Sequence, residues 1–391
     1  MSKAGTFDNK NVLCIVETPF QALVATCLFL MDENRHFNRC DLVVHDRFSG
    51  AQQLADNLRA SGCFTKVIYA ANGYPLQDHQ GIEYFKDHIL HKNACEQRFR
   101  DSYPELAGKT YDVLVCSVVN RFTIDARRYC VPSGISAFID DGLGSHNGKT
   151  FDSLLFLDQG TSGVCCQHPT LSQQFKRVLR WPLRIVAGKG CTYEMRELWL
   201  LFVSDAERSL YSELPLKRIE LPEDWSVLYQ AIQGTPNLPD YTDGTTIYLA
   251  LPKEGGVNLD DELNCLEEIR KSCGGRMYVR PHPRGDSTAY EDRGYTIIDP
   301  TLSWELLLAS GCIRDDIVLA GFGSTAQMLP PLVFGMHARN LFLNKVVPGS
   351  AIPIDSVNDM VNNLIQGGCQ AESLLVPDSY EDLREAMRRW T

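Results

Sequence analysis

The sequence lacks the features that mark secreted, membrane-spanning or nucleic-acid-binding proteins. Its first eight residues have neither the charged start nor the apolar run of a signal peptide. The longest apolar runs, Ala22–Met31 and Leu198–Val203, are too short to cross a bilayer. The net charge of −11 argues against nucleic acid as the main partner, because phosphate backbones attract basic surfaces. We therefore expect a cytoplasmic protein that binds no nucleic acid.

Familiar metal and phosphate motifs are also missing. The 14 cysteines form no C-x-x-C pair, and no Cys/His spacing is typical of a zinc site. Scattered cysteines without an export signal are expected to be reduced thiols in the core. The chain also contains no P-loop, no G-x-G-x-x-G and no Asp-x-Asp. A metal-dependent nucleotide site is therefore not expected.

The first third of the chain alternates between strand-like and helix-like segments. Short apolar runs rich in β-branched residues, separated by helices, are typical of a parallel sheet covered on both faces. We predict a Rossmann-like domain. Its strands are expected at 11–17, 41–45, 66–70, 111–117 and 135–140, and its helices at 20–31, about 50–61 and about 82–98.

The middle of the chain is less regular. Leu171–Gly190 interleaves basic with aromatic and aliphatic residues, which suits either an anionic membrane surface or a solvated face over the core. Gly234–Gly244 is rich in turn formers and is interpreted as a loop or linker.

From Thr246 the alternation resumes, and it predicts a second Rossmann-like domain. The fold class is α/β, with two facing doubly wound domains and the ligand in the cleft between them. The predicted strands are 246–251, 277–280, 295–298, 316–320 and 340–343, and the helices are 259–273, 303–310, 325–334 and 380–390.

Two loops in the first domain could carry chemistry. Thr18-Pro19-Phe20-Gln21 follows the first strand, although a helix N-cap with proline in the first turn explains it equally well. Asp140-Asp141-Gly142 follows a buried strand. Adjacent carboxylates raise the pKa of at least one of them, which suits a general base, whereas the plain alternative is an acidic turn.

Two loops in the second domain could bind an anion. In the segment Arg280-Pro281-His282-Pro283-Arg284, alternation should turn the three basic side chains to one side, and the prolines should hold His282 stiffly past the strand. Such a group suits a phosphate that accepts a proton, whereas a solvent-exposed strand exit is the alternative. The segment Ala320–Gln327 follows a predicted strand and opens a helix, where glycines, hydroxyls and backbone N–H groups bind anions.

Together these motifs, in this order, resemble the bacterial sialyltransferases. The resemblance is greatest to glycosyltransferase family 52, the lipooligosaccharide sialyltransferases, and families 80 and 38 share the motif trio. It is carried by Thr-Pro-x-Gln at 18–21, Asp-Asp-Gly at 140–142, His282-Pro283 and Ser324-Thr325. It implies a GT-B fold and an inverting, metal-independent transfer from CMP-sialic acid to a sugar hydroxyl. It also implies an acceptor-side domain at 1–190, a CMP-donor-binding domain at 191–375, and a helix at 376–391 that packs back on the first domain.

The resemblance also assigns roles to residues. Asp140 would be the base, Asp141 would support its loop, and Asp260 is a second candidate for the base, although Asp260-Asp261 also suits helix N-terminal charge. His282 would bind or protonate the departing phosphate. The residues assigned to donor binding are Thr18, Pro19, Gln21, Arg280, Pro283, Arg284, Gly323, Ser324 and Thr325.

The expected partners follow from the same resemblance. They are a CMP-sugar donor and a galactose of a surface glycan such as lipooligosaccharide or capsule, with no metal or other cofactor. Peripheral contact with the inner membrane and a homodimer are further expectations. Two alternatives stay open. One is transfer from another CMP- or CDP-activated donor carrying Kdo, a related nonulosonic acid or glycerol phosphate. The other is a non-catalytic GT-B-like scaffold, which would tolerate Asp140→Asn.

Overall fold

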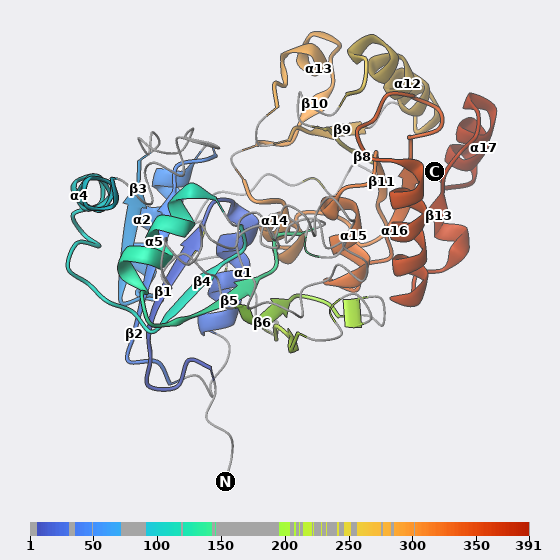
Figure 1. The fold of residues 1–391 in the computed structure, drawn as a ribbon. Coiled ribbons are helices and arrows are strands. Elements are labelled where there is room, and N and C mark those ends of the chain that lie inside the picture. The colour runs from blue at the N-terminus through green and yellow to red at the C-terminus, as the bar shows by residue number, and fades with distance from the viewer. Residues whose placement is uncertain are drawn as a thin grey trace, which may run out of the picture. The chain divides into compact units, whose positions relative to one another are not determined.

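A computed structural model divides the chain into two compact units, Met1–Glu223 and Asp224–Thr391 (Figure 1). The residues that it describes are 6–30, 36–48, 50–71, 91–118, 120–142, 195–203, 214–220, 246–251, 256–274, 277–282, 285–300 and 302–390, with isolated positions between 145 and 241.

The N-terminal unit contains a seven-stranded parallel sheet in the order β3-β2-β1-β4-β5-β6-β7. Parallel neighbours need a crossover, and a helix lies in each connection between the first five strands. The strands are β1 Asn11–Val16, β2 Arg39–His45, β3 Lys66–Ala70, β4 Val113–Cys116, β5 Ile135–Ile139, β6 Met195–Leu200 and β7 Leu216–Arg218. The helices are α1 Pro19–Leu30, α2 Ala51–Ser61, α4 Lys92–Ser102 and α5 Arg121–Cys130.

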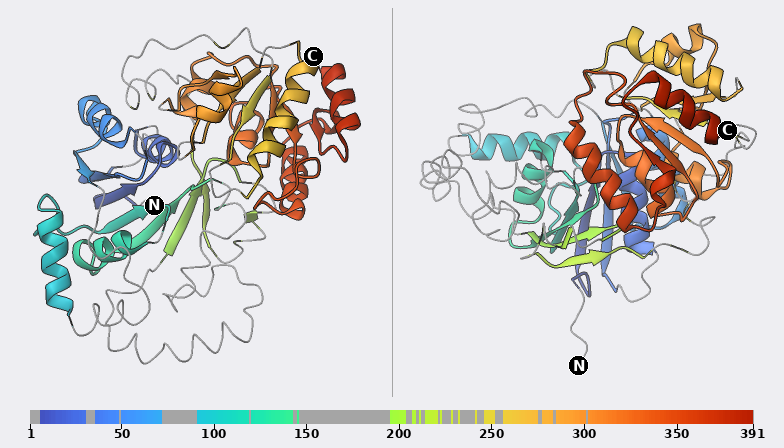
Figure 2. Two further views of the ribbon diagram at one scale, coloured as in Figure 1. Left: turned by 90° about the horizontal axis from the view of Figure 1, so that it is seen from above. Right: turned by 90° about the vertical axis from the view of Figure 1, so that its right-hand side faces the viewer.

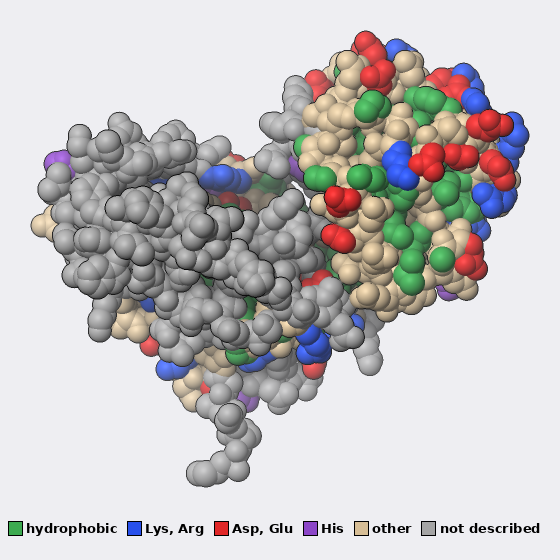
Figure 3. All heavy atoms as spheres, turned by 45° about the vertical axis from the view of Figure 1, so that its right-hand side comes forward, with side chains coloured by type: hydrophobic (Ala, Val, Ile, Leu, Met, Phe, Trp, Pro, Cys, Tyr) green, Lys and Arg blue, Asp and Glu red, His purple; other side chains and the backbone are tan. Residues whose placement is uncertain are grey.

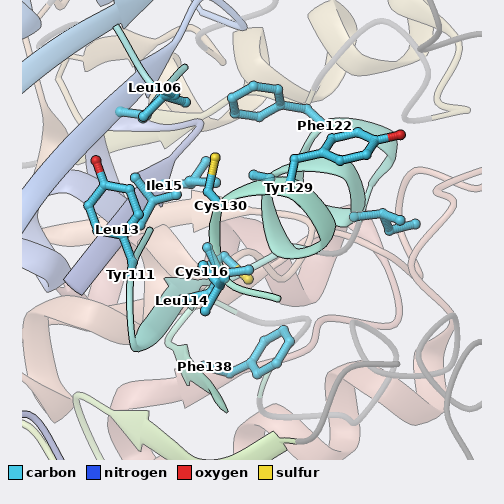
Figure 4. Close-up of a cluster of buried hydrophobic side chains, with 14 of the residues drawn as sticks. Leu13, Ile15, Leu106, Tyr111, Leu114, Cys116, Phe122, Tyr129, Cys130 and Phe138 are labelled. Carbon is cyan, nitrogen blue, oxygen red and sulfur yellow. The ribbon is translucent and has the colours of Figure 1, made fainter. Parts of the chain in front are cut away.

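The core of this unit follows from strand alternation. Leu13 and Ile15 of β1 turn to one face of the sheet, where they join Phe99 of α4 and Phe122 of α5 in one buried cluster (Figure 4). The other face carries α1 (Figures 1 and 2). Because both faces are covered, the central strands β1 and β4 are almost wholly apolar, and the rigid edge of the sheet can hold polar loops in place.

The C-terminal unit contains a six-stranded parallel sheet in the order β10-β9-β8-β11-β12-β13. Numbered within each sheet, both units share the order 3-2-1-4-5-6. The strands are β8 Thr246–Leu249, β9 Met277–Arg280, β10 Thr296–Ile297, β11 Val318–Gly321, β12 Arg339–Phe342 and β13 Leu374–Leu375. The helices are α12 Leu259–Ser272, α13 Thr288–Asp292, α14 Trp304–Ala309, α15 Thr325–Leu332, α16 Ile354–Gln366 and α17 Tyr380–Trp390.

The last helix packs within its own unit. Leu383 and Met387 of α17 lie in the buried cluster that also contains Leu266 of α12, and Arg384 pairs with Glu268 of α12 at 2.9 Å. The apolar face of α17 is therefore used here, whereas the sequence predicted packing against the first domain. On the face shown in Figure 3, acidic and basic side chains are interspersed over this unit.

The predicted boundary at residue 190 is too early. Strands β6 and β7, which the sequence did not predict, extend the first sheet to Arg218, and the first unit ends at Glu223. Helices α5 and α16 were also missed. The predicted helix at 82–98 lies partly outside the described residues. The basic segment 171–190 lies wholly outside them, and of the linker 234–244 only Tyr241 is described.

Candidate active site

Polar loops gather where the strand order of each sheet reverses. With the order 3-2-1-4-5-6, ligands bind beside the carboxyl ends of the first and fourth strands. In the N-terminal unit these strands are β1, followed by Glu17 and Gln21, and β4, followed by Asn120. In the C-terminal unit the fourth strand is β11, which leads into Ser324. The Thr18–Gln21 loop after β1 and the Ser324 loop after β11 therefore begin where this fold presents ligands, whereas Asp140-Asp141 follows β5 and His282 follows β9.

Gln21 ties the first loop to the acidic loop. Its side chain is fully buried, and its amide oxygen accepts the backbone N–H of Glu17 at 2.6 Å. Its amide nitrogen donates to Oδ1 of Asp141 at 2.5 Å. Thr18 accepts the N–H of Gln21 at 3.1 Å, and Pro19 begins α1, as expected of a capped helix start. This arrangement brings Thr-Pro-x-Gln together with Asp-Asp-Gly.

Asp140 is a buried residue that stabilises its own loop. It is 1% exposed, and its two carboxylate oxygens accept the N–H of Gly142 at 2.8 Å and the N–H of Leu201 at 3.1 Å. Gly142 adopts a φ of 87°, which favours glycine and lets the chain turn back over the carboxylate. Asp140 thus holds the loop to the strand end of β6.

Asp141 has the environment of a general base. It is half-buried, and its own N–H donates to the hydroxyl of Ser145 at 2.8 Å. The pKa of Asp141 is raised to about 7, mainly by burial; the hydrogen bond from Gln21 lowers it, and the nearby carboxylates of Asp140 and Glu17 contribute to the rise. A carboxylate with this pKa accepts protons efficiently near neutral pH.

A second carboxylate at this edge was not predicted. Glu17 is 8% exposed, accepts a hydrogen bond from the side-chain amide of Asn120, and lies 3.8 Å from Arg47. Burial raises the pKa of Glu17, while Arg47 lowers it. Asn120 also caps α5 in a reciprocal pair with Thr123. The Asn-x-x-Thr spacing after a strand was the signal that could have marked this loop.

The basic segment after β9 is only partly as predicted. Arg280 is 6% exposed and donates to the backbone carbonyls of Asp299 and Leu302. It therefore holds the loop between β10 and α14, and its guanidinium is engaged by these backbone carbonyls. His282 is half-buried, and its carbonyl accepts the N–H of Gly285 at 2.7 Å. Pro283 and Arg284 lie outside the described residues.

The loop after β11 has the features of an anion site. Gly323 adopts a φ of 82°, and its N–H donates to the side-chain oxygen of Gln327 at 2.8 Å. Ser324 is the N-cap of α15, and its hydroxyl oxygen is buried without a hydrogen-bond partner among the described residues. Thr325 begins the helix. An unpaired hydroxyl beside a helix N-terminus suits a phosphate oxygen.

Asp260 does not have the surroundings expected of a base. It is exposed in the first turn of α12, where the side chain of Asn258 accepts the N–H groups of Asp260 at 2.9 Å and Asp261 at 3.3 Å. Acidic residues at a helix N-terminus are favourable with the helix dipole. The alternative that the sequence left open, helix N-terminal charge, therefore accounts for this pair.

No three His, Cys, Asp or Glu side chains among the described residues gather as metal ligands would. None of the described helices is long and apolar enough to cross a membrane.

Comparison with known proteins shows what the fold is. The sequence matches no family model and no curated protein. Among solved structures, the spinosyn forosaminyltransferase SpnP aligns with a TM-score of 0.50 and 12% identity over 98% of this chain and 90% of its own. The fold is GT-B. A further similar structure is an α/β-galactoside α-2,3-sialyltransferase from Photobacterium phosphoreum, with TM-score 0.47 and 10% identity over 96% of this chain and 100% of its own. A third is the E. coli heptosyltransferase WaaC, with TM-score 0.41 and 11% identity over 97% of this chain and 100% of its own.

Proposed function

We propose that the protein is an inverting glycosyltransferase that moves sialic acid from CMP-sialic acid to a sugar hydroxyl. The GT-B fold supports a sugar-nucleotide transferase, and the four motif loops support a sialyltransferase. The observation that carries the proposal is Asp141, a half-buried carboxylate with a pKa of about 7 that the side chain of Gln21 joins to the loop after β1, where this fold binds ligands.

Asp141 is proposed as the general base, in place of Asp140. The acceptor hydroxyl gives its proton to Asp141 as its oxygen forms a bond to the anomeric carbon of sialic acid. The bond between that carbon and the CMP phosphate oxygen breaks at the same time, and its electron pair leaves with CMP. Asp140 is unsuited to this step because both its oxygens are engaged by backbone N–H groups.

The C-terminal unit is proposed to bind the CMP donor. The helix N-terminus at Ser324 and Thr325 would hold the single phosphate, since its buried hydroxyl and backbone N–H groups are donors for phosphate oxygens. His282 would donate to the leaving phosphate oxygen or protonate it. One phosphate leaving from an oxocarbenium-like transition state carries limited charge, so these donors can stabilise it without a metal ion.

The acceptor is proposed to be a galactose of a bacterial surface glycan, such as lipooligosaccharide or capsule. The proposed place of work is the cytoplasmic face of the inner membrane, where a sugar nucleotide and a lipid-linked glycan meet. The dimeric state that the family resemblance implies also stays a proposal.

A donor screen tests the function. The purified chain is incubated with CMP-sialic acid, CMP-Kdo and CDP-glycerol in parallel, each with and without lactose, and release of CMP, the leaving group of all three transfers, is measured. We expect lactose-stimulated CMP release from CMP-sialic acid alone. Release from one of the other donors would establish a different transferase, and no release from any donor would favour a non-catalytic scaffold.

Two substitutions test the base. Asp141→Asn should lower turnover at least 10²-fold, the size of a general-base contribution, with CMP affinity largely retained. The matched control is Asp260→Asn, which removes an exposed carboxylate from a helix start and should leave turnover within about twofold. Full activity in Asp141→Asn, or its loss in Asp260→Asn, would contradict this assignment.

A further inference from the structure

The side-chain amide of Gln21 can take only one orientation. Its oxygen accepts the N–H of Glu17 at 2.6 Å, and a backbone N–H can only donate. The amide nitrogen must therefore face Asp141, to which it donates at 2.5 Å. A flipped amide would set two donors against each other at Glu17 and two acceptors against each other at Asp141. Full burial of Gln21 keeps water from relieving either clash.

The C-terminal unit contains a second buried glutamine with the same arrangement at a helix start, but its side-chain amide donates to a different kind of group. Gln327 is also fully buried, and its side-chain oxygen accepts the N–H of Gly323, again four residues earlier. Its amide nitrogen donates at 3.3 Å to the carbonyl of Leu341 on the neighbouring strand. Both glutamines thus fasten a helix start to its sheet. Gln21 alone of the two directs its donor at a titratable group.

We propose that Gln21 is the positioning residue for Asp141, fixing the direction of its carboxylate and favouring its ionised form. This inference rests on the proposed function, because it takes Asp141 as the base. Gln21 touches neither reacting sugar in this role. It acts by holding Oδ1, and no described residue donates to Oδ2, which leaves that oxygen for the acceptor hydroxyl.

The other groups around Asp141 oppose its ionisation. Asp140 precedes it in the same loop, and Glu17 approaches from the end of β1, and both negative charges raise the pKa of Asp141. The buried thiol of Cys116 in β4 lies within electrostatic reach and stays protonated, since its own pKa is well above the ordinary value. Among the described residues, the cation Arg47 pairs with Glu17, at 3.8 Å, and not with Asp141. The amide of Gln21 is thus the group that lowers the pKa of Asp141.

The pH profile of turnover distinguishes this role from a purely structural one. CMP release with lactose as acceptor is measured from pH 5 to pH 9.5 for the wild type and Gln21→Met. Without the donor the base ionises at higher pH, so we expect the acidic limb to move up by about one pH unit. That corresponds to roughly a tenfold loss at pH 6 that is recovered above pH 8.5.

Gln327→Met is the matched control. It removes the two corresponding hydrogen bonds of Gln327, with the N–H of Gly323 and the carbonyl of Leu341, and neither of these partners is titratable. It should lower activity by a similar factor at every pH, with the acidic limb unmoved. If the limb moved equally in both variants, or stayed in place in Gln21→Met, the positioning role would be wrong.

A second variant keeps the test informative if Gln21→Met does not fold. Gln21→Glu has the same shape and can still accept the N–H of Glu17, but its negative charge faces Asp141. It should move the acidic limb to higher pH than the methionine does. An unmoved limb in Gln21→Glu overturns the inference. A wild type that releases no CMP from any donor instead overturns the proposed function.

Discussion

Asp141→Asn should stabilise the N-terminal unit while it removes activity. The folded protein raises the pKa of Asp141 from 3.8 to about 7, a difference of roughly three units. Each unit corresponds to about 1.4 kcal/mol, so the ionised carboxylate costs at most about 4 kcal/mol of folding free energy. Asparagine is neutral at every pH, and its side-chain oxygen can still accept the hydrogen bond from Gln21.

The sign of this effect depends on pH. A carboxyl group whose pKa is raised by folding favours the folded state most below the unfolded pKa, and that advantage is lost as pH rises through about 7. The gain from Asp141→Asn should therefore be about 1 kcal/mol at pH 4.5 and about 4 kcal/mol at pH 8.

Differential scanning calorimetry of the full chain measures this gain. For a unit of this size, about 4 kcal/mol corresponds to a rise in Tm of roughly 10 °C at pH 8. The control is Asp140→Asn, which replaces an acceptor of two backbone N–H groups and should cost about 2 kcal/mol at both pH values. Equal gains from Asp141→Asn at pH 4.5 and pH 8 would refute the reasoning.

Three further changes test the C-terminal unit. Arg280→Met leaves two loop carbonyls without their donor and should lower the unfolding free energy of the C-terminal unit by about 3 kcal/mol. A calorimetric decrease below about 0.5 kcal/mol would contradict the inference that Arg280 holds this loop. Gly323→Ala forces a side chain into a φ of 82° with its Cβ 3.1 Å from the sulfur of Met360, and should cost about 1–2 kcal/mol and weaken CMP binding in calorimetric titration. His282→Ala should slow CMP release about 10²-fold with CMP affinity retained, and equal losses in both would indicate a binding role alone.

Much of the fold could be predicted because its strands are buried on both faces. Continuous apolar runs located β3 and β9 with the bounds that the structure shows. Helix α5 was missed for the converse reason: it carries three arginines and an aspartate, a composition typical of exposed segments, yet each of its residues is buried. Arg121 and Asp125 pair at 2.9 Å, which compensates two charges that sequence periodicity counts as solvated.

The loops of the candidate site could be located from the sequence, but the roles of their individual residues could not be assigned from it. Proline and glycine punctuation located the strand ends, and like charges marked Asp140-Asp141 as unusual. Which aspartate receives backbone N–H groups depends on β6, and β6 joins the sheet from more than 50 residues away. Alternation was likewise insufficient for Arg280, because the carbonyls of the loop after β10 attract its guanidinium inward.

β6 and β7 join the first sheet from residues far along the chain, and this limits where the chain can be cut into fragments. β6 covers the edge of β5, and β7 covers β6. A fragment cut at residue 190 would expose the backbone of β5 as an open strand edge, which templates aggregation, and Asp140 would lose Leu201 as a donor. Ribosomal synthesis meets the same condition, since the first sheet cannot be completed until residue 218 has emerged. A soluble N-terminal fragment should therefore extend to Glu223.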